Sequence, residues 1–227
     1  MDIWVLIPVK SPFKSKNRLA HLLTAEQRAQ LIRGLLKQEL AVLNQIPAIT
    51  QVLVISSDPT VWALARQYGA QVEEEPGSQG LNKAVRRGMV VAAANGASGA
   101  LLLPVDLPFI TASDVTLLLN AGLDMPIMNA QADKLLTSAG DNGSQCSKSN
   151  ISVMAICGDE EGEGTNALFL DPKTIFTFHY GPGSFQRHVK EANRRGLTVR
   201  IVRAPGLQFD LDNEKDWLIY QASTVNC

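Results

Sequence analysis

The sequence predicts an α/β protein in which a mixed, mostly parallel β-sheet is flanked by helices. Short apolar runs alternate along the chain with segments of helical periodicity, which is typical of this class. The first run, residues 3–9, is apolar throughout, as expected of a strand buried on both faces. The 227 residues contain no internal repeat and no Pro/Gly-rich linker, so we expect a single domain over residues 1–227.

Cap and turn residues predict the boundaries of the remaining elements. Thr24 with Gln27 has the pattern of a capping box, and so has Thr111 with Asp114. Asp58 precedes a proline that suits the first turn of a helix. We expect strands at 52–55, 70–73, 100–105, 151–157 and 197–202, and a short strand or turn at 208–211. Helices are expected from 24 to about 40, between 58 and 69, and at 81–94, 111–119, 184–195 and 214–221.

Composition and charge exclude several classes of protein. Twenty-one basic and 22 acidic residues give a formal charge of −1, which argues against a dedicated nucleic-acid or membrane-surface binder. No apolar run approaches the ~18 residues of a membrane span, and the first residues do not resemble a secretory signal. The three cysteines are far apart and lack metal-ligand spacing. We therefore expect a reduced, cytoplasmic protein.

Residues 131–150 differ in character from the rest of the chain. This segment is polar, rich in Gly and Ser, and without periodicity. We expect it to form a long surface loop or a flexible insertion.

A cluster of basic residues follows the first predicted strand. In open α/β sheets ligands bind outside the carboxyl ends of the strands, and this strand is followed by Lys10, Lys14, Lys16 and Arg18. Fixed positive charge at such a position suits a polyphosphate, although a solvated basic loop is an equally good interpretation. The motifs of the P-loop and of dinucleotide-binding domains are absent here.

Three aspartates indicate a site for a divalent cation. Asp106 directly follows an apolar strand, where an unpaired carboxylate would be costly to bury. Asp210 and Asp212 are two residues apart, which in extended chain places both carboxylates on one face. Hard oxygen ligands of this kind suit Mg²⁺. The alternative is that Asp106 and Asp212 are helix or turn caps.

Two glycine-rich segments each bring a hydroxyl close to backbone N–H groups. The hydroxyls belong to Thr165 and to Ser184, and the latter opens a predicted helix. The alternative for both segments is a tight turn with a helix cap. The acidic stretch at 159–163 is interpreted as a solvated face, and the histidines as packing or surface residues. No pattern of a nucleophile with its base stands out, but a phosphomonoester, with a second pKa of about 6, is already an anionic nucleophile at neutral pH.

Several of these segments together resemble one family. The segments are IPVK with KSKNRLAHLL, GLNKAVRRG, LLLPVDLPFIT, GEGTNALFL, YGPGSFQRHVKEA and PGLQFDLDNEKDW. In this order they are similar to the 2-phospho-L-lactate guanylyltransferase family of deazaflavin coenzyme F(420) biosynthesis, some of whose members act on phosphoenolpyruvate or 3-phosphoglycerate. The resemblance covers nearly the whole chain and implies the Rossmann-like fold of nucleotide-diphospho-sugar transferases.

The resemblance also implies roles for particular residues. GTP would bind the N-terminal half and the phosphorylated three-carbon acid the C-terminal half, with Mg²⁺ between them. Carried over by position, Asp106, Asp210 and Asp212 would hold Mg²⁺, and Lys10, Lys16 and Arg18 would contact the triphosphate. The resemblance implies a catalytic role for these three basic residues and for Asp106. The base and ribose would lie against Pro8, Val9, Glu74, Gly80 and Asn82, and the acceptor would contact Thr165, Gly181 and Ser184.

The resemblance implies transfer of GMP from GTP to the acceptor's phosphate, with release of pyrophosphate. Two alternatives stay open: a nucleotidyltransferase that uses a sugar phosphate or molybdopterin, and a catalytically silent nucleotide-binding protein. Candidate protein partners are a second copy of the chain and the downstream transferase that uses the product. We expect no nucleic-acid and no membrane partner.

Overall fold

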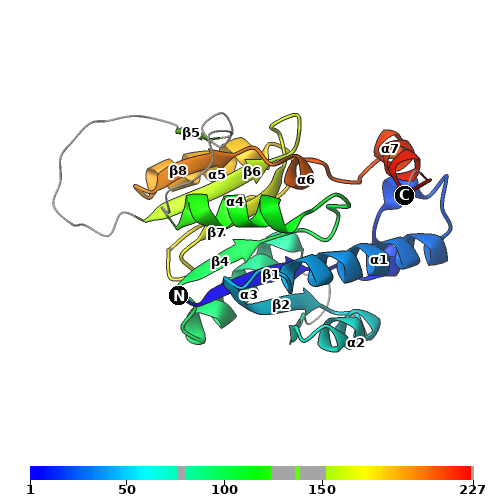
Figure 1. Ribbon diagram of the computed structural model, residues 1–227, viewed down its shortest axis with the longest axis horizontal. Coiled ribbons are helices and arrows are strands. Elements are labelled where there is room, and N and C mark those ends of the chain that lie inside the picture. Colours follow the sequence, from blue (N-terminus) through cyan, green and yellow to red (C-terminus); the bar gives the residue numbers. More distant parts are fainter. Residues whose placement is uncertain (76–79, 124–135, 139–151, 226–227) are drawn as a thin grey trace.

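The computed structural model describes residues 1–75, 80–123, 136–138 and 152–225. Within these ranges the chain forms one eight-stranded sheet with helices on both faces (Figure 1). The strands are β1 (Ile3–Pro8), β2 (Ile49–Ser56), β3 (Gln71–Glu74), β4 (Gly99–Leu102), β5 (Leu136–Ser138), β6 (Val153–Gly158), β7 (Thr165–Leu170) and β8 (Thr198–Val202). The helices are α1 (Ala25–Leu43), α2 (Pro59–Gln67), α3 (Leu81–Ala94), α4 (Ala112–Gly122), α5 (Ser184–Arg194), α6 (Pro205–Gln208) and α7 (Glu214–Val225), with 3-10 helices η1 (Pro12–Lys14) and η2 (Asn17–Leu19) after β1.

The strands lie in the order β3-β2-β1-β4-β7-β6-β8-β5. The first four are parallel to one another, and β6 is parallel to β8. β7 runs antiparallel to both of its neighbours, β4 and β6. The predicted α/β class with a mixed, mostly parallel sheet is therefore confirmed. Because β7 is reversed, its first residue lies at the same edge of the sheet as the last residues of β1, β4 and β6.

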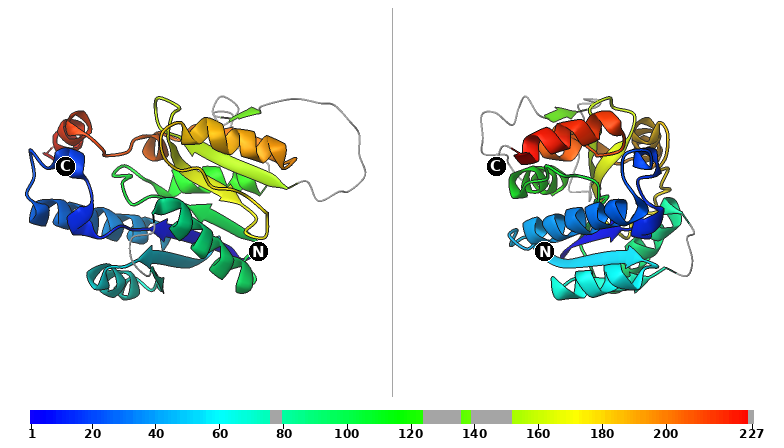
Figure 2. Two further views of the ribbon diagram at one scale, coloured as in Figure 1. Left: turned by 180° about the vertical axis from the view of Figure 1, so that it is seen from behind. Right: turned by 90° about the vertical axis from the view of Figure 1, so that its right-hand side faces the viewer.

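Both faces of the sheet are covered by apolar side chains. In β1, Ile3, Val5 and Ile7 pack into the cluster that holds α1, α2 and α4, while Trp4 and Leu6 pack into the cluster that holds α3 and α5. Figures 1 and 2 show α1 and α4 on one side of the sheet and α3 and α5 on the other. This two-sided burial explains why β1 reads as an uninterrupted apolar run.

The predicted helix starts are confirmed. Thr24 and Gln27 form a capping box at α1, and Thr111 and Asp114 form one at α4. The side chain of Asp58 accepts a hydrogen bond from the backbone N–H of Thr60 at the start of α2. In each case a side-chain oxygen satisfies a backbone donor that the first helical turn leaves unpaired.

Three of the predicted elements differ in the structure. Within 131–150, residues Leu136–Ser138 form β5, which pairs antiparallel with β8, and the rest of that segment lies outside the described residues. The strand or turn expected at 208–211 is wrong at its start, because Pro205–Gln208 form α6 with proline in its first turn. The strand expected at 100–105 ends at Leu102, since the following residues leave the sheet toward Asp106.

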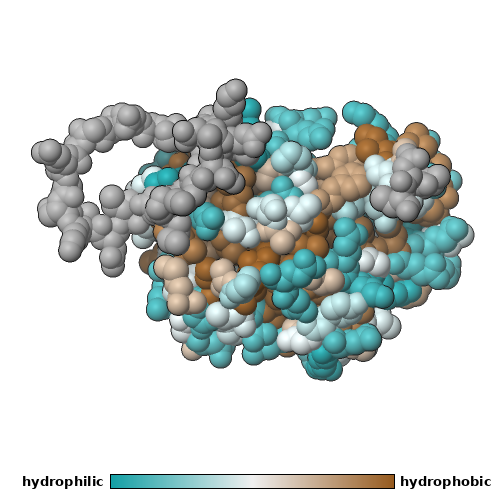
Figure 3. Space-filling model, viewed as in Figure 1, coloured by the Kyte–Doolittle hydropathy of each residue, from teal (hydrophilic) through white to brown (hydrophobic). Residues whose placement is uncertain are grey.

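The surface is mostly hydrophilic, with two apolar areas on the face drawn in Figure 3. One lies over the middle of the molecule between α1 and α4, and the other lies at α7, where Leu218 and Ile219 are exposed (Figure 3). Among the described residues no helix has the length and apolar character that crossing a membrane requires.

One acidic side chain, Glu39 of α1, is buried without a partner. Its residue is 2% exposed, and neither carboxylate oxygen has a hydrogen-bond partner in the described part of the chain. Burial raises the pKa of Glu39 well above its ordinary value, and the negative charge of Asp106 adds to this effect. Holding this carboxyl charged inside the protein is unfavourable, so its ionisation opposes folding.

We predict that Glu39→Gln stabilises the protein at neutral and alkaline pH. The pKa of Glu39 in the folded protein lies above its ordinary value of 4.5. The protonated carboxyl therefore contributes its full stability below pH 4.5, and this contribution is lost as the pH rises through the folded-state pKa. Glutamine has no proton to lose, so urea unfolding at pH 7.5 will show a gain of about 1–3 kcal/mol. The gain will vanish at pH 4. Glu26→Gln, at an exposed position of the same helix, is the control, and a pH-independent gain for Glu39→Gln would contradict the prediction.

Candidate functional site

The ends of several strands bring polar residues to one edge of the sheet. The segment after β1 carries the basic residues, and Asp106 lies four residues after β4. Thr165 opens β7 and reaches the same edge because β7 is antiparallel to β4. Residues that are far apart in the sequence are thereby gathered at the carboxyl ends of the parallel strands, where α/β sheets bind their ligands.

The basic segment after β1 is folded into two turns of 3-10 helix and is held in place by side chains from elsewhere. The hydroxyl of Ser11 donates to Asp58 at 2.9 Å, and Arg28 of α1 donates through Nε to the carbonyl of Ser15 at 3.2 Å. Lys16 lies between η1 and η2 with a φ of 52°, the left-handed region that non-glycine residues rarely adopt. This kink turns the side chain of Lys16 inward, where it is 6% exposed.

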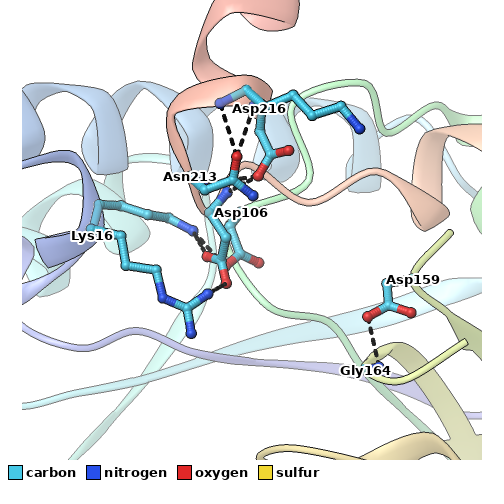
Figure 4. A network of polar contacts seen from close by, with 9 residues as sticks. Lys16, Asp106, Asp159, Gly164, Asn213 and Asp216 are labelled. Carbon is cyan, nitrogen blue, oxygen red and sulfur yellow. Dashed lines mark hydrogen bonds and ion pairs between the residues drawn. The ribbon is translucent and has the colours of Figure 1, made fainter. Parts of the chain in front are cut away.

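The ammonium of Lys16 lies between two aspartates. Its Nζ is 2.7 Å from Oδ2 of Asp106 and 2.7 Å from Oδ1 of Asp212, and Arg18 Nη1 lies 3.7 Å from Asp212 Oδ2 (Figure 4). Burial alone would lower the pKa of Lys16, but the two carboxylates raise it above its ordinary value. Burial alone would raise the pKa of Asp212, but Lys16 and then Arg18 lower it. Lys16 and Asp212 therefore each favour the charged form of the other in the folded protein.

The backbone around Asp212 is fixed by a second acidic residue. The N–H groups of Asp212 and Asn213 each donate to Asp216 Oδ2 at 2.9 Å, at the start of α7 (Figure 4). The side chain of Asp212 is therefore not a helix cap. Asn213 accepts the hydrogen bonds from the backbone N–H groups of Lys215 and Asp216, whereas the Asp212 carboxylate faces Lys16.

Asp210 lies beside these residues, and its pKa is shifted in the opposite direction to that of Asp212. Burial, followed by the charges of Asp106 and Asp212, raises the pKa of Asp210 to about 6, against a lowering by the amide of Asn166. Lys16 forms ion pairs with Asp106 and Asp212 but not with Asp210, so repulsion by these two carboxylates adds to the effect of burial on Asp210.

Two cavities adjoin at this cluster. The first has a volume of about 390 Å³ and the second about 420 Å³. Both are lined by Pro8, Arg18, Leu81, Pro104, Asp106 and Asp212, which form their common boundary. The first is further lined by Val9, Lys10, Lys14, Lys16, Asn17, Glu75 and Gly80, and the second by Asp159, Glu163, Thr165, Asn166, Tyr180, Gly181, Ser184 and Asp210, among others.

Most of the predicted site residues therefore lie around these two cavities, and two do not. Glu74 ends β3 at an exposed position and lines neither cavity, whereas the next residue, Glu75, lines the first. The side chain of Asn82 bonds the backbone of Tyr180, accepting from its N–H at 2.7 Å and donating to its carbonyl at 3.2 Å. Asn82 thus ties the start of α3 to the second glycine-rich segment instead of facing a cavity.

The first glycine-rich segment includes site residues that the sequence did not indicate. The sequence predicts a solvated position for Asp159, but its carboxylate accepts from the N–H of Gly164 at 2.6 Å (Figure 4). It also accepts from the N–H of Glu163 at 2.8 Å, and Asp159 lines the second cavity. A Cβ at Gly164 would lie 2.6 Å from this carboxylate, so the close approach needs glycine. The signal in the sequence was an aspartate ahead of a Gly-x-Gly turn; Glu160 and Glu161 are exposed, as expected.

The carboxylates of Asp106, Asp210 and Asp212 have the chemistry to bind a divalent cation, although the ammonium of Lys16 lies between Asp106 and Asp212. No group of three acidic, His or Cys side chains in the described part of the chain is arranged to enclose a metal ion. Yet Asp106, Asp159, Glu163, Asp210 and Asp212 line the second cavity, and Arg18 is the one basic residue among the described residues of its lining, so added positive charge would favour an anion there. The assignment of Mg²⁺ to Asp106, Asp210 and Asp212 stays a prediction.

Comparison with known proteins shows similarity to one family over nearly the full length of the chain. Residues 3–139 and 145–220 match the family model described as Guanylyl transferase CofC like. The chain is 34% identical to the phosphoenolpyruvate guanylyltransferase of Rubrobacter xylanophilus, covering 98% of this chain and 95% of that one. It is also 34% identical to the phosphoenolpyruvate guanylyltransferase of Roseiflexus castenholzii, covering 97% and 90%.

Solved structures are similar in fold at much lower identity. A putative nucleotide-diphospho-sugar transferase from Desulfovibrio desulfuricans G20 has a TM-score of 0.71 at 16% identity, covering 99% of this chain and 88% of that one. A 4-diphosphocytidyl-2C-methyl-D-erythritol synthase has a TM-score of 0.56 at 14% identity, covering 97% of each chain. The expected fold type, that of nucleotide-diphospho-sugar transferases, is thus confirmed.

We predict that Lys16→Met destabilises the protein between about pH 4 and pH 10. The lowered pKa of Asp212 stabilises the fold above its ordinary value of 3.8, and the raised pKa of Lys16 does so up to its ordinary value of 10.5. Removing the ammonium leaves the carboxylates of Asp106 and Asp212 without the cation between them, which lowers the free energy of unfolding by about 1–3 kcal/mol. The loss is no larger because the Asp212 side chain is 42% exposed, and solvent screens its charge. Urea unfolding at pH 7 measures the loss, which will shrink below pH 4. Lys14→Met, at an exposed position of the same segment, is the control, and an equal loss in both variants would refute the prediction.

Proposed function

We propose that this chain transfers GMP from GTP to the phosphate of phosphoenolpyruvate. The chain belongs to the family of CofC-like guanylyl transferases and is a nucleotidyltransferase. The family membership gives the guanylyl transfer. The acceptor is proposed because relatives at 34% identity over nearly the whole chain carry phosphoenolpyruvate in their names.

The observation that carries the proposal is the charge arrangement where the two cavities meet. Basic side chains line the first cavity, hydroxyls and glycine-rich turns line the second, and Asp106 and Asp212 lie on their common boundary. A triphosphate on one side and a phosphorylated acid on the other would bring their phosphates together at this boundary. Two anionic reactants can be held together only where fixed cations offset their charge.

In the proposed complex the triphosphate of GTP lies in the first cavity. Lys10, Lys16 and Arg18 contact its phosphates, and Lys14 of the same segment adds a further positive charge. For Lys16 this requires the ammonium to exchange at least one of its two aspartate partners for a phosphate oxygen. Pro8, Val9 and Gly80 give the lining against which the base and ribose lie.

The acceptor lies in the second cavity, against Thr165, Gly181 and Ser184. Gly181 has a φ of 124° and Gly183 one of 68°, so this turn depends on glycine for its shape. Ser184 begins α5, so its hydroxyl lies at the positive end of a helix, which favours an oxyanion. The backbone N–H groups of Ser184 and Phe185 already donate to the carbonyls of Gly181 and Glu163, at 3.0 and 3.2 Å. The acceptor's carboxylate and phosphate are the anions that this end of the cavity would receive.

The reaction forms a bond between an oxygen of the acceptor's phosphate and the α-phosphorus of GTP, and it breaks the bond from that phosphorus to the β-phosphate. The phosphate is an anionic nucleophile at neutral pH, so no side chain has to remove a proton. The basic side chains of the first cavity stabilise the charge that develops on the departing pyrophosphate. Asp106, Asp210 and Asp212 would hold Mg²⁺, which supplies charge neutralisation between the two sets of phosphates when bound.

A panel of nucleotides and acceptors tests the proposed substrates. We expect pyrophosphate release with GTP and phosphoenolpyruvate, and much slower release with ATP, CTP or UTP. Faster turnover with 2-phospho-L-lactate or 3-phosphoglycerate would replace the proposed acceptor and keep the reaction. Turnover with a sugar phosphate or molybdopterin alone would favour another branch of nucleotidyltransferases, and nucleotide binding without turnover for any acceptor would favour a silent binding protein.

We predict that Asp106→Asn lowers kcat about 100- to 1000-fold while the protein stays folded. The substitution keeps the size of the side chain and removes a charge from the boundary of the two cavities. Glu160→Gln changes an exposed acid near the site and is the matched control. Circular dichroism and thermal unfolding check the fold of both variants. Turnover of Asp106→Asn within a few-fold of the unmodified protein would remove this residue from the catalytic assignment.

A further inference from the structure

A buried histidine lies directly behind the hydroxyls of the second cavity. His188 of α5 is fully buried and is not part of the lining of either cavity. Its Nδ1 is 3.0 Å from the hydroxyl oxygen of Thr165, and its Nε2 accepts a hydrogen bond of 2.8 Å from the backbone N–H of His179. The hydroxyl of Ser184 in turn lies 3.1 Å from that of Thr165.

The backbone donor determines which ring nitrogen carries the proton. An N–H group can only donate, so Nε2 of His188 must be unprotonated where it meets the N–H of His179. Burial lowers the pKa of His188 to about 4, with smaller contributions from His179 and Arg187, so the ring is neutral at pH 7. A neutral ring with a bare Nε2 carries its proton on Nδ1, which therefore donates to Thr165.

This tautomer changes what the hydroxyl pair offers to the cavity. Thr165 and Ser184 have two hydroxyl protons between them, and one is used in the bond that joins them. If Nδ1 of His188 were an acceptor, it would take the second proton, and only lone pairs would face the cavity. Because Nδ1 is a donor, one hydroxyl proton stays free for a ligand oxygen.

We propose that His188 is a positioning residue that makes the Thr165–Ser184 pair a hydrogen-bond donor toward the second cavity and thereby selects an anionic oxygen on the acceptor. The identity of that acceptor rests on the proposed function, whereas the direction of the hydrogen bonds does not. The rings of Phe176 and Tyr180 lie 6.0 and 4.9 Å from the His188 ring and hold it in place. Because the backbone N–H of His179 can only donate, it sets the direction of the hydrogen bonds from His188 to Thr165 and Ser184.

The tautomer can be tested without any substrate. Long-range ¹H–¹⁵N spectra of the labelled full-length protein distinguish a protonated from an unprotonated ring nitrogen, and the chain has three histidines to assign. We expect His188 to show a bare Nε2 and a protonated Nδ1 from pH 6 to pH 8. A protonated Nε2 would overturn the proposal, whatever reaction the protein performs.

The effect on the acceptor is tested with matched variants. His188→Asn places an amide that can donate near the position of Nδ1, whereas His188→Leu removes the donor and keeps an apolar side chain of similar bulk. With phosphoenolpyruvate as the probe, we expect His188→Leu to raise the acceptor's KM tenfold or more with the KM of GTP unchanged, and His188→Asn to recover most of the loss. His21→Asn, on the surface, is the control.

Two results in these variants would count against the role of His188. Equal losses in His188→Asn and His188→Leu, or parallel rises in the KM of GTP and of the acceptor, would indicate a merely structural role and overturn the proposal. Failure of the unmodified protein to use phosphoenolpyruvate would instead refute the proposed acceptor, and the spectra would still decide the tautomer.

Discussion

The mutual repulsion of aspartates at one edge of the sheet is the constraint on which the site depends. Asp106 arrives from the segment after β4 and Asp212 from the segment before α7, and both point at the same place. Two partly buried carboxylates cannot remain charged there without a cation. Lys16 supplies it, at the expense of a left-handed backbone conformation, and Arg28 and Asp58 hold the segment that carries it.

The two cavities differ in the charge of their linings, and this difference is related to the position of the aspartates. Asp106 and Asp212 lie on their common boundary, and Lys16, which pairs with both, lines the first cavity together with Lys10 and Lys14. Hydroxyls, glycine-rich turns and further carboxylates line the second cavity. Burial, followed by the charges of Asp106 and Asp212, raises the pKa of Asp210 to about 6, so a third charged carboxylate is unfavourable at this edge. The proposed Mg²⁺ would offset negative charge at this edge.

Much of the fold was predictable because local chemistry determines it. The capping boxes at Thr24 and Thr111 and the two-sided burial of β1 follow from short-range patterns, and the structure has them. The reversal of β7 was not predictable, since a buried antiparallel strand in a mixed sheet has the same apolar run as a parallel one. That reversal is what brings Thr165 to the edge that also carries Asp106.

The site was predictable in its residue types and less so in its contacts. Aspartates, lysines and glycine-rich turns were recognisable, but the pairing of Lys16 with residues 90 and 196 positions away depends on tertiary structure. Glu74 and Asn82, carried over from the family by position, line neither cavity, because Glu74 is exposed and the Asn82 side chain bonds the backbone of Tyr180. Asp159 was missed because an acidic run is usually solvated, and only the turn at Gly164 brings its carboxylate inward.

The two outermost strands have a consequence for how the molecule behaves in concentrated solution. β3 is four residues long and ends in two glutamates, and the three residues of β5 pair with β8, which would otherwise present its open side. Long, flat, unpaired borders invite other chains to add as further strands and so to aggregate. With a short charged strand at one border and a short terminal strand at the other, the sheet offers a neighbouring molecule little backbone to join.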